Sequence, residues 1–267
     1  MTVHDPVGLV RRVLPISLSL LIVAAATAQP PVPGGRGRQA PRQGVRRMRP
    51  PESVEVVRDV VFGTGGGREL RLSIARPRNP TVEPTPAIVF IHGGAWLSGD
   101  NNPAPNYPLA EAGFFTVSIE YRLSSEAIFP AQIQDCKAAI RWLRANAASY
   151  HIDPERIGVW GSSAGGHLAA LVGTSGGVAE LEGDGGNPGH SSAVQAVVDL
   201  FGPSDLLKIA DYQSGIDRSR PDCPEALLLG GMMQDKADLA KMASPITYID
   251  RGDPPFLIFH GDRDNTV

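Results

Sequence analysis

The sequence G-S-S-A-G at residues 161–165 constrains this chain more than any other feature. An apolar run, residues 157–160, precedes it, and a helix-like run, residues 166–172, follows it. A G-x-S-x-G pattern between a strand and a helix is typical of a nucleophile elbow, where the serine occupies a sharp, strained turn. A Cβ at either flanking glycine would crowd that turn. The pattern therefore predicts that Ser163 is a nucleophile at the tip of a strand, with the Ala164 N–H free to bind an oxyanion.

Short apolar runs and helical patterns alternate along the rest of the chain. Strands are expected at residues 54–62, 69–75, 87–91, 114–119, 157–160, 194–201 and 255–260. Helical spacing covers residues 128–150 and 163–173. This alternation predicts an α/β fold with a mostly parallel sheet, helices on both faces and an antiparallel N-terminal edge. Residues 203–252 break the rhythm, and we expect either a small cap over the strand ends or an irregular surface loop there.

The first 51 residues have the composition of an extension. Two arginines precede an apolar stretch, residues 13–26, and a small-residue cleavage site ends at Ala28. Residues 1–28 are therefore predicted to be a secretory signal peptide, which implies a periplasmic or extracellular protein with no stable membrane span after cleavage. An uncleaved membrane anchor is the alternative, although the apolar stretch is short for a span. Residues 29–51 are rich in Pro, Gly and Arg, and we expect a flexible linker.

The net charge differs strongly between this extension and the rest of the chain. Eight of the 25 Lys and Arg residues but only one of the 28 Asp and Glu residues precede residue 52. The expected domain, residues 52–267, therefore has a formal net charge of −10, which would repel the phosphates of a nucleic acid. The sequence has no metal-ligand cluster, dinucleotide fingerprint or P-loop, so neither a metal nor a cofactor is expected.

The two cysteines, Cys136 and Cys223, are expected to be free thiols. Cys136 lies on the apolar stripe of the helix expected over residues 128–150, where a free cysteine packs as a small hydrophobic residue. A disulfide is the alternative in an exported protein.

An oxyanion hole is expected in the segment His92-Gly93-Gly94-Ala95-Trp96, which follows the strand at residues 87–91. A catalytic serine needs a base, an orienting acid and donors for the developing negative charge. Glycines allow backbone N–H groups to approach a ligand closely. We therefore expect Gly93 and Gly94 to donate, with Ala164 on the other side. His92 is expected to shape this loop through a hydrogen bond, because a base would follow the acid in this fold.

The orienting acid is expected in the loop after the last strand, within His260-Gly261-Asp262-Arg263-Asp264. Asp264 is favoured by its distance from the strand end, and Asp262 is the rival. No histidine follows Asp264 in this sequence. His167 and His260 are expected near the site, but neither follows the acid as a base should.

Several segments together resemble the acetyl esterase/lipase branch of the α/β-hydrolases, and particularly the bacterial proteins related to bifunctional feruloyl and acetyl-xylan esterases. The resemblance runs from about Val54 to the last residue and rests on residues 92–96, 120–123, 129–132, 153–157, 161–166 and 256–264. Ala95 stands where family members often have a third glycine, and it keeps its backbone N–H.

The resemblance implies a serine carboxylesterase that hydrolyses acetyl or feruloyl esters of polysaccharide, or small esters, through an acyl-enzyme. It also implies a histidine in a loop beyond the acid, after one more strand. We therefore expect a C-terminally truncated domain that lacks its last strand and helix, and a chain that is inactive without its base.

Two other readings stay open. A prolyl-oligopeptidase-type peptidase shares the fold and the triad but usually carries a large extra domain, for which residues 54–267 have no room. A non-catalytic binding module with a hydrolase fold is the third possibility.

Overall fold

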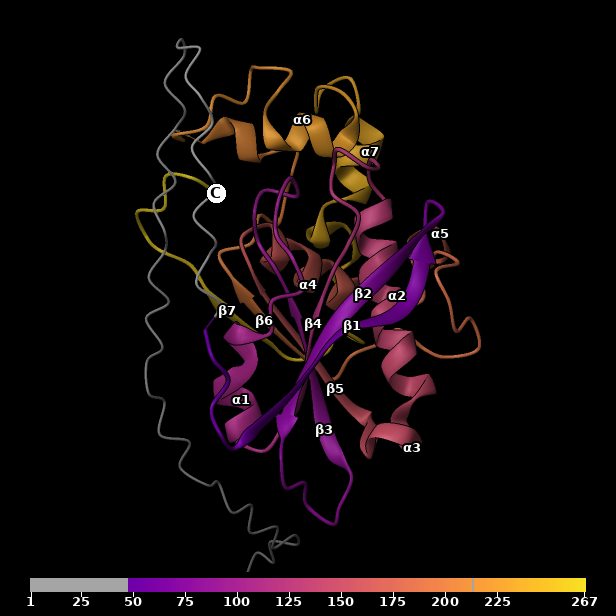
Figure 1. Ribbon diagram of the computed structural model, residues 1–267. Helices are drawn as coiled ribbons and strands as arrows, with labels where there is room; N and C mark the ends of the chain where they lie inside the picture. The colour runs from indigo at the N-terminus through magenta and orange to yellow at the C-terminus, as the bar shows by residue number, and fades with distance from the viewer. Residues whose placement is uncertain (1–47, 213) are drawn as a thin grey trace, which may run out of the picture. The chain divides into compact units, whose positions relative to one another are not determined.

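The computed structural model describes residues 48–212 and 214–267, which include a single sheet of seven strands (Figure 1). The strand order is β1-β2-β4-β3-β5-β6-β7. The strands are β1 (Val54–Gly65), β2 (Arg68–Pro77), β3 (Thr85–Ile91), β4 (Phe115–Ile119), β5 (Ile152–Ser162), β6 (Ala196–Leu200) and β7 (Phe256–Phe259). The pairs β1–β2 and β2–β4 are antiparallel, and the other four pairs are parallel. The predicted parallel sheet with an antiparallel N-terminal edge is confirmed.

Helices cover both faces of this sheet, as predicted. Ile74 and Ala75 are neighbours on β2, so their side chains point to opposite faces. Ile74 packs into the main core, whereas Ala75 packs with Tyr107 and Ala110 of α1. The helices are α1 (Tyr107–Glu111), α2 (Ala131–Ala145), α3 (Ala147–Tyr150), α4 (Ala164–Thr174), α5 (Ala179–Glu182), α6 (Pro224–Leu229) and α7 (Ala237–Met242).

The long helix predicted over residues 128–150 is shorter and interrupted. Helix α2 begins only after Pro130, and Asn146 separates it from α3. The Asn146 side chain donates a hydrogen bond to the carbonyl oxygen of Trp142 at 2.9 Å. This local bond competes with helix continuation, which the apolar stripe used in the prediction does not reveal. Cys136 in α2 and Cys223 before α6 are buried and free, as expected.

Residues 203–252 form a small cap that contains α6, α7 and short 3₁₀ segments (Ile209–Asp211 and Pro245–Tyr248). Leu206, Leu228 and Met233 are buried in the main core, which excludes the alternative of an irregular surface loop. Figure 1 shows α6 and α7 beyond the carboxyl ends of the parallel strands. The cap therefore stands over the edge of the sheet where β5 turns into α4.

Strand β7 lies at the edge of the sheet and pairs only with β6 within the described residues. Its side chains Leu257, Ile258 and Phe259 are 51%, 61% and 47% exposed. The outer side of β7 therefore presents backbone groups that could pair with another strand. Among the described helices, none is long and apolar enough to cross a membrane.

Candidate active site

Ser163 occupies the strained turn that the G-x-S-x-G pattern predicts. Its backbone has φ 53° and ψ −124°, a region that residues with a side chain rarely adopt and that clusters at functional sites. A Cβ at Gly161 would lie 2.2 Å from the Gly165 carbonyl oxygen, and a Cβ at Gly165 would lie 2.1 Å from the Ile91 carbonyl oxygen. The Ser163 N–H donates to Leu200 of β6 at 2.9 Å. Two glycines and a strand neighbour thus hold the turn in place.

The loop with Asp264 lies at the same edge of the sheet as Ser163. Ser162 pairs with Leu200, and Leu200 pairs with Phe259, so the elbow and the loop after β7 begin at matching heights. The two strands are separated by one other strand, which places them roughly 10 Å apart. The Asp264 N–H donates to the Gly261 carbonyl oxygen at 3.2 Å, so the chain turns there.

Asp264 is held mainly by the backbone that follows it. Its Oδ1 accepts hydrogen bonds from the N–H groups of Thr266 at 2.8 Å and Val267 at 3.1 Å. Its Oδ2 lies 3.8 Å from Nε2 of His260. Asp262, the rival, is exposed and forms no hydrogen bond among the described residues. Asp264 is exposed as well, and its role as the acid stays a prediction.

The predicted oxyanion donors come from two segments that pack against each other. A Cβ at Gly93 would lie 2.7 Å from the Ser162 carbonyl oxygen, so the loop after β3 touches the elbow directly. Within the described residues, the N–H groups of Gly93, Gly94 and Ala164 donate to no backbone carbonyl. Three backbone donors are thus left unpaired around the serine, which is the arrangement that an oxyanion hole needs.

His92 is buried at the start of the segment 92–96 after β3, which we call the oxyanion loop. Its ring stacks on Tyr121 with 4.3 Å between centroids, and its Nδ1 lies 2.8 Å from the Gly93 carbonyl oxygen. Burial lowers the pKa of His92, although the Gly93 carbonyl acts in the opposite direction. A neutral ring that donates to its own loop shapes that loop, as the sequence predicts, and does not point to a base.

His167 lies on α4 and is completely buried. Its Nε2 donates to the Ala243 carbonyl oxygen of the cap at 2.7 Å, and its Nδ1 accepts from Nε1 of Trp96 at 3.3 Å. Both ring nitrogens are therefore occupied. His167 ties the oxyanion loop, the elbow helix and the cap together, a role that the sequence did not indicate.

No described histidine serves Ser163 as a base in this structure. Within the described residues Ser163 Oγ forms no hydrogen bond, and the His260 ring lies beside Asp264 with its Nε2 3.2 Å from the Val267 carbonyl oxygen. His151 contacts the carbonyl oxygen of Val82, far from the elbow in the sheet. The described part of the site therefore holds the predicted nucleophile, the predicted acid and the predicted oxyanion donors.

Sequence reasoning missed the side chains that pack against the oxyanion loop and bond to its backbone. The Tyr121 hydroxyl donates to the His92 carbonyl oxygen at 3.0 Å. Next to it, Arg122 forms an ion pair with Asp135 of α2 at 2.8 Å, with the two side chains 15% and 2% exposed. Burial raises the pKa of Asp135, while Arg122 acts to lower it. The segment 120–123 carried only a family resemblance in the sequence, and no pattern gave its partner on α2.

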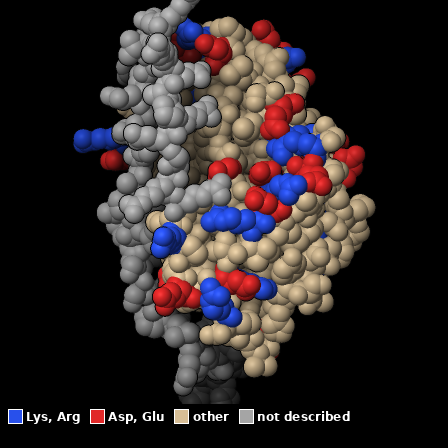
Figure 2. Space-filling model, viewed as in Figure 1, with Lys and Arg blue, Asp and Glu red and all other residues tan. Residues whose placement is uncertain are grey.

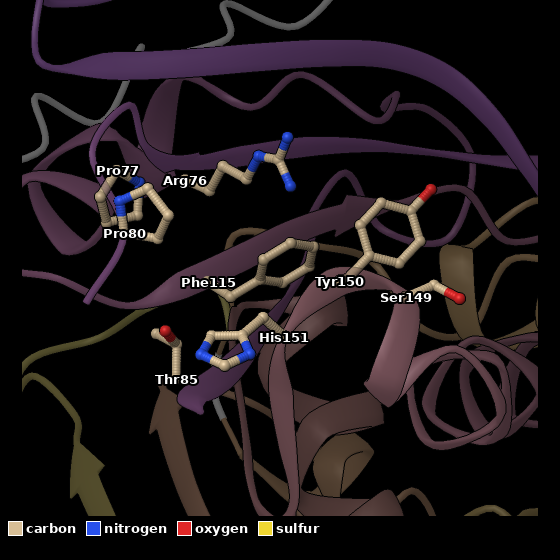
Figure 3. Close-up of a pocket in the computed structure, with 8 residues that line it drawn as sticks. All are labelled: Arg76, Pro77, Pro80, Thr85, Phe115, Ser149, Tyr150 and His151. Carbon is tan, nitrogen blue, oxygen red and sulfur yellow. The ribbon is translucent and has the colours of Figure 1, made fainter. Parts of the chain in front are cut away.

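A cavity of about 110 Å³ lies away from this site (Figure 3). Thr85 and Phe115, which begin β3 and β4, line it together with His151. It therefore lies at the amino ends of the parallel strands, whereas Ser163 follows the carboxyl end of β5. Ligands of open α/β sheets bind at the carboxyl ends, so this cavity is separate from the candidate active site.

Charges are mixed on the face of the molecule in Figure 2, where Lys and Arg alternate with Asp and Glu over the described residues. Ion pairs among the described residues include Arg68–Glu126 at 2.6 Å and Arg76–Glu55 at 2.9 Å. Within the described residues, no group of three or more His, Cys, Asp or Glu side chains is arranged to hold a metal ion.

The sequence model of the BD-FAE family matches residues 72–267, which are most of the chain. The chain belongs to the BD-FAE family. The BD-FAE domain thus includes the oxyanion loop, the elbow and the loop with Asp264. The α/β-hydrolase fold predicted from the sequence is confirmed by its solved structural neighbours, which are esterases.

Curated relatives of this BD-FAE chain are also esterases. The chain is 35% identical to Esterase LipQ of Mycobacterium tuberculosis over 216 residues, which are 78% of this chain and 49% of that protein. It is 34% identical to Esterase LipC of the same organism over 200 residues, which are 73% of this chain and 48% of that protein. The chain therefore spans about half the length of these relatives.

Among solved structures, the BD-FAE chain is similar to a carbohydrate esterase from gut microbiota, described as a truncated form. The TM-score is 0.72 and the identity 39%, over 82% of this chain and 81% of that one. A bifunctional GH43-CE protein of Bacteroides eggerthii gives a TM-score of 0.68 and 39% identity over 79% of this chain and 29% of that one. Butyrate-bound esterase 2 of Thermogutta terrifontis gives 0.62 and 31%, over 81% and 74%.

Proposed function

We propose that this BD-FAE domain belongs to a serine carboxylesterase in which Ser163 attacks the acyl carbon of an ester. The observation that carries the proposal is the strained Ser163 backbone beside three unpaired N–H groups. The oxygen of the attacked carbonyl would become negatively charged and accept hydrogen bonds from Gly93, Gly94 and Ala164. The alcohol would then leave, and water would release the acyl group from Ser163.

In this proposal Asp264 orients a histidine that takes the proton of the Ser163 hydroxyl. Within the described residues, no histidine is hydrogen-bonded to Ser163. The histidine nearest the Asp264 carboxylate there is His260, whose Nε2 lies 3.8 Å from Oδ2. Losing the base of a serine triad costs on the order of 10⁶ in kcat. We therefore expect only slow turnover by the chain as it stands, so the hydrolysis rates below are measured on a form of the protein that carries the triad histidine.

Acetyl or feruloyl esters of a polysaccharide are the proposed substrate class. This finer assignment rests on the 39% identity to a carbohydrate esterase and to a protein that joins GH43 and CE parts. Small esters are the competing class, supported by the butyrate-bound neighbour. A panel of acetyl, butyryl and feruloyl esters, compared by kcat/KM, separates these classes.

Replacement of Ser163 by alanine tests the proposed nucleophile. Hydrolysis of p-nitrophenyl acetate, measured by release of p-nitrophenol, is expected to fall to the buffer rate in Ser163→Ala. Ser162→Ala is the matched control, because it removes a hydroxyl from the neighbouring residue and should keep the parent's rate. Equal rates in the parent and Ser163→Ala would contradict the esterase proposal and favour a non-catalytic module.

We also propose that residues 1–28 are a signal peptide that directs export, and that residues 29–51 form a linker before the domain. Both segments lie outside the described residues, except for residues 48–51. The proposal rests on the charged start, the apolar stretch and the small-residue cleavage site. After expression in a bacterium, mass spectrometry of the periplasmic protein is expected to find Gln29 as the first residue. An intact first residue on a membrane-bound protein would contradict export with cleavage.

A further inference from the structure

The Tyr121 hydroxyl is bonded to the peptide that carries a predicted oxyanion donor. Tyr121 is 1% exposed, and its hydroxyl donates to the His92 carbonyl oxygen at 3.0 Å. The peptide between His92 and Gly93 is trans, and in a planar trans peptide the N–H points opposite to the carbonyl. A bond that holds the His92 oxygen therefore also fixes the direction of the Gly93 N–H.

The Tyr121 bond is well placed to determine this peptide plane. Among the described residues, no backbone N–H outside the strand ladders bonds to the His92 oxygen. Burial raises the pKa of Tyr121, so its hydroxyl keeps the proton that it donates. Stacking on the His92 ring, with an interplanar angle of 16°, keeps the phenol directly beneath the loop.

The following two peptides are held in the same manner. Nδ1 of His92 donates to the Gly93 oxygen at 2.8 Å, which fixes the Gly94 N–H. The Gly94 oxygen accepts from the N–H groups of Leu97 at 2.9 Å and Ser98 at 3.1 Å. Gly99 leaves space for the imidazole, since a Cβ there would lie 2.0 Å from Nδ1. The carbonyl oxygens of His92, Gly93 and Gly94 thus each accept a hydrogen bond, and the N–H of the following residue points the opposite way.

Tyr121 itself is anchored to helix α2 through the next residue. The Arg122 N–H donates to Oδ2 of Asp135 at 2.8 Å, and the guanidinium donates to both carboxylate oxygens. Arg122 Nη2 also donates to the Ala131 carbonyl oxygen at 3.3 Å. The hydrogen bonds of Arg122 to α2, the backbone from Arg122 to Tyr121 and the Tyr121 hydroxyl bond therefore connect the first half of α2 to the His92–Gly93 peptide.

We propose that Tyr121 is a positioning residue of the oxyanion hole, whose hydroxyl holds the His92–Gly93 peptide with its N–H directed toward the acyl oxygen at Ser163. This inference rests on the proposed function. Tyr121 acts through the peptide and does not touch the substrate. Its loss should therefore weaken stabilisation of the tetrahedral anion and lower kcat, while KM changes little.

Tyr121→Phe tests the proposal, because it keeps the stacked ring and removes only the hydroxyl. Tyr248→Phe is the matched control, since the Tyr248 hydroxyl donates to a backbone carbonyl of the cap, that of Met242, at 2.9 Å. The full chain is labelled with ¹⁵N-glycine, and the amide signals of Gly93 and Gly94 are followed. In the ligand-free chain, Tyr121→Phe is expected to move the Gly93 signal more than other glycine signals, and Tyr248→Phe to leave it in place.

Phenylboronic acid then probes the hole, because it forms a tetrahedral anion on a serine hydroxyl. We expect its Kd to rise about tenfold in Tyr121→Phe, less than the roughly 10²–10³ that removal of an oxyanion donor itself costs in kcat, because the Gly93 N–H is misdirected and not removed. In Tyr248→Phe the Kd should stay within about twofold of the parent. The same split is expected in the Ser163-dependent p-nitrophenyl acetate rate, where kcat falls and KM is kept.

The outcomes separate this inference from the proposed function. Boronate binding that is identical in the parent and in Ser163→Ala would contradict the proposed nucleophile, and the ligand-free Gly93 signal would then decide the role of Tyr121. An unmoved Gly93 signal in Tyr121→Phe would overturn the positioning role. So would an unchanged boronate Kd in a chain whose binding does depend on Ser163.

Discussion

Gly165→Ala is expected to destabilise the domain by about 3 kcal/mol and to remove Ser163-dependent ester hydrolysis. The new Cβ would lie 2.1 Å from the carbonyl oxygen of Ile91 and 2.7 Å from that of His92. Both atoms belong to backbone that cannot rotate away, unlike the end of a flexible side chain. Helix α4 would have to move outward and carry the Ser163 turn with it. Relief of the clash therefore distorts the elbow and the oxyanion loop together.

Urea unfolding of Gly165→Ala, followed by circular dichroism, measures this loss. Gly176→Ala is the matched control, because nothing lies within 4 Å of a Cβ at Gly176 and its backbone is not in the left-handed region. The control should unfold within about 0.5 kcal/mol of the parent. A Gly165→Ala variant as stable as this control would show that the described packing of the elbow on β3 is wrong.

Acid is expected to weaken the fold through His167. Burial lowers the pKa of His167 to about 4, although its bond to the Ala243 carbonyl acts to raise it. In the unfolded chain a histidine has a pKa of about 6.5, so folding favours the neutral ring. A lowered pKa contributes stability that is complete above about pH 6.5 and is lost as the pH falls toward 4. The loss amounts to about 3 kcal/mol over that range.

His167→Gln isolates this contribution from the carboxylates that also titrate in acid. Glutamine keeps one donor for Ala243 and one acceptor for Trp96 but has no proton to gain. Unfolding free energies measured from pH 7 to pH 4 should therefore fall about 3 kcal/mol further in the parent than in the variant. His190→Gln, at an exposed histidine, should follow the parent. Parallel curves for the parent and His167→Gln would contradict the buried neutral ring.

Local patterns were sufficient to predict the fold and the position of Ser163. Apolar runs at residues 87–91 and 157–160 mark strands buried on both faces, and these runs are indeed neighbours in the sheet. Glycine is required at both flanks of the elbow, because a Cβ at Gly161 would clash with the Gly165 backbone and a Cβ at Gly165 with the Ile91 backbone. The local G-x-S-x-G pattern alone therefore predicts the turn. The helix over 128–150 was predicted too long because the break at Asn146 comes from one side-chain bond, not from periodicity.

The supporting side chains could not be predicted, because their partners are distant in the sequence. His167 bonds to Trp96 and to Ala243, which are 71 and 76 residues away. Tyr121 and His92 are 29 residues apart, and their contact depends on β3 and β4 lying side by side in parallel. No spacing rule within one segment gives such contacts. The sequence therefore predicts which residues react, and the fold shows which side chains contact those residues.

The position of a covalent label tests the central claim most directly. The full chain is incubated with a fluorophosphonate, digested, and its peptides are sequenced by mass spectrometry. We predict a slow reaction that places the phosphonyl group on Ser163 in the parent, in Ser162→Ala and, more slowly, in Tyr121→Phe, with no adduct at this peptide in Ser163→Ala. A label on Ser162 or on another residue, or the same labelling in Ser163→Ala as in the parent, would contradict the account of Ser163 as the nucleophile.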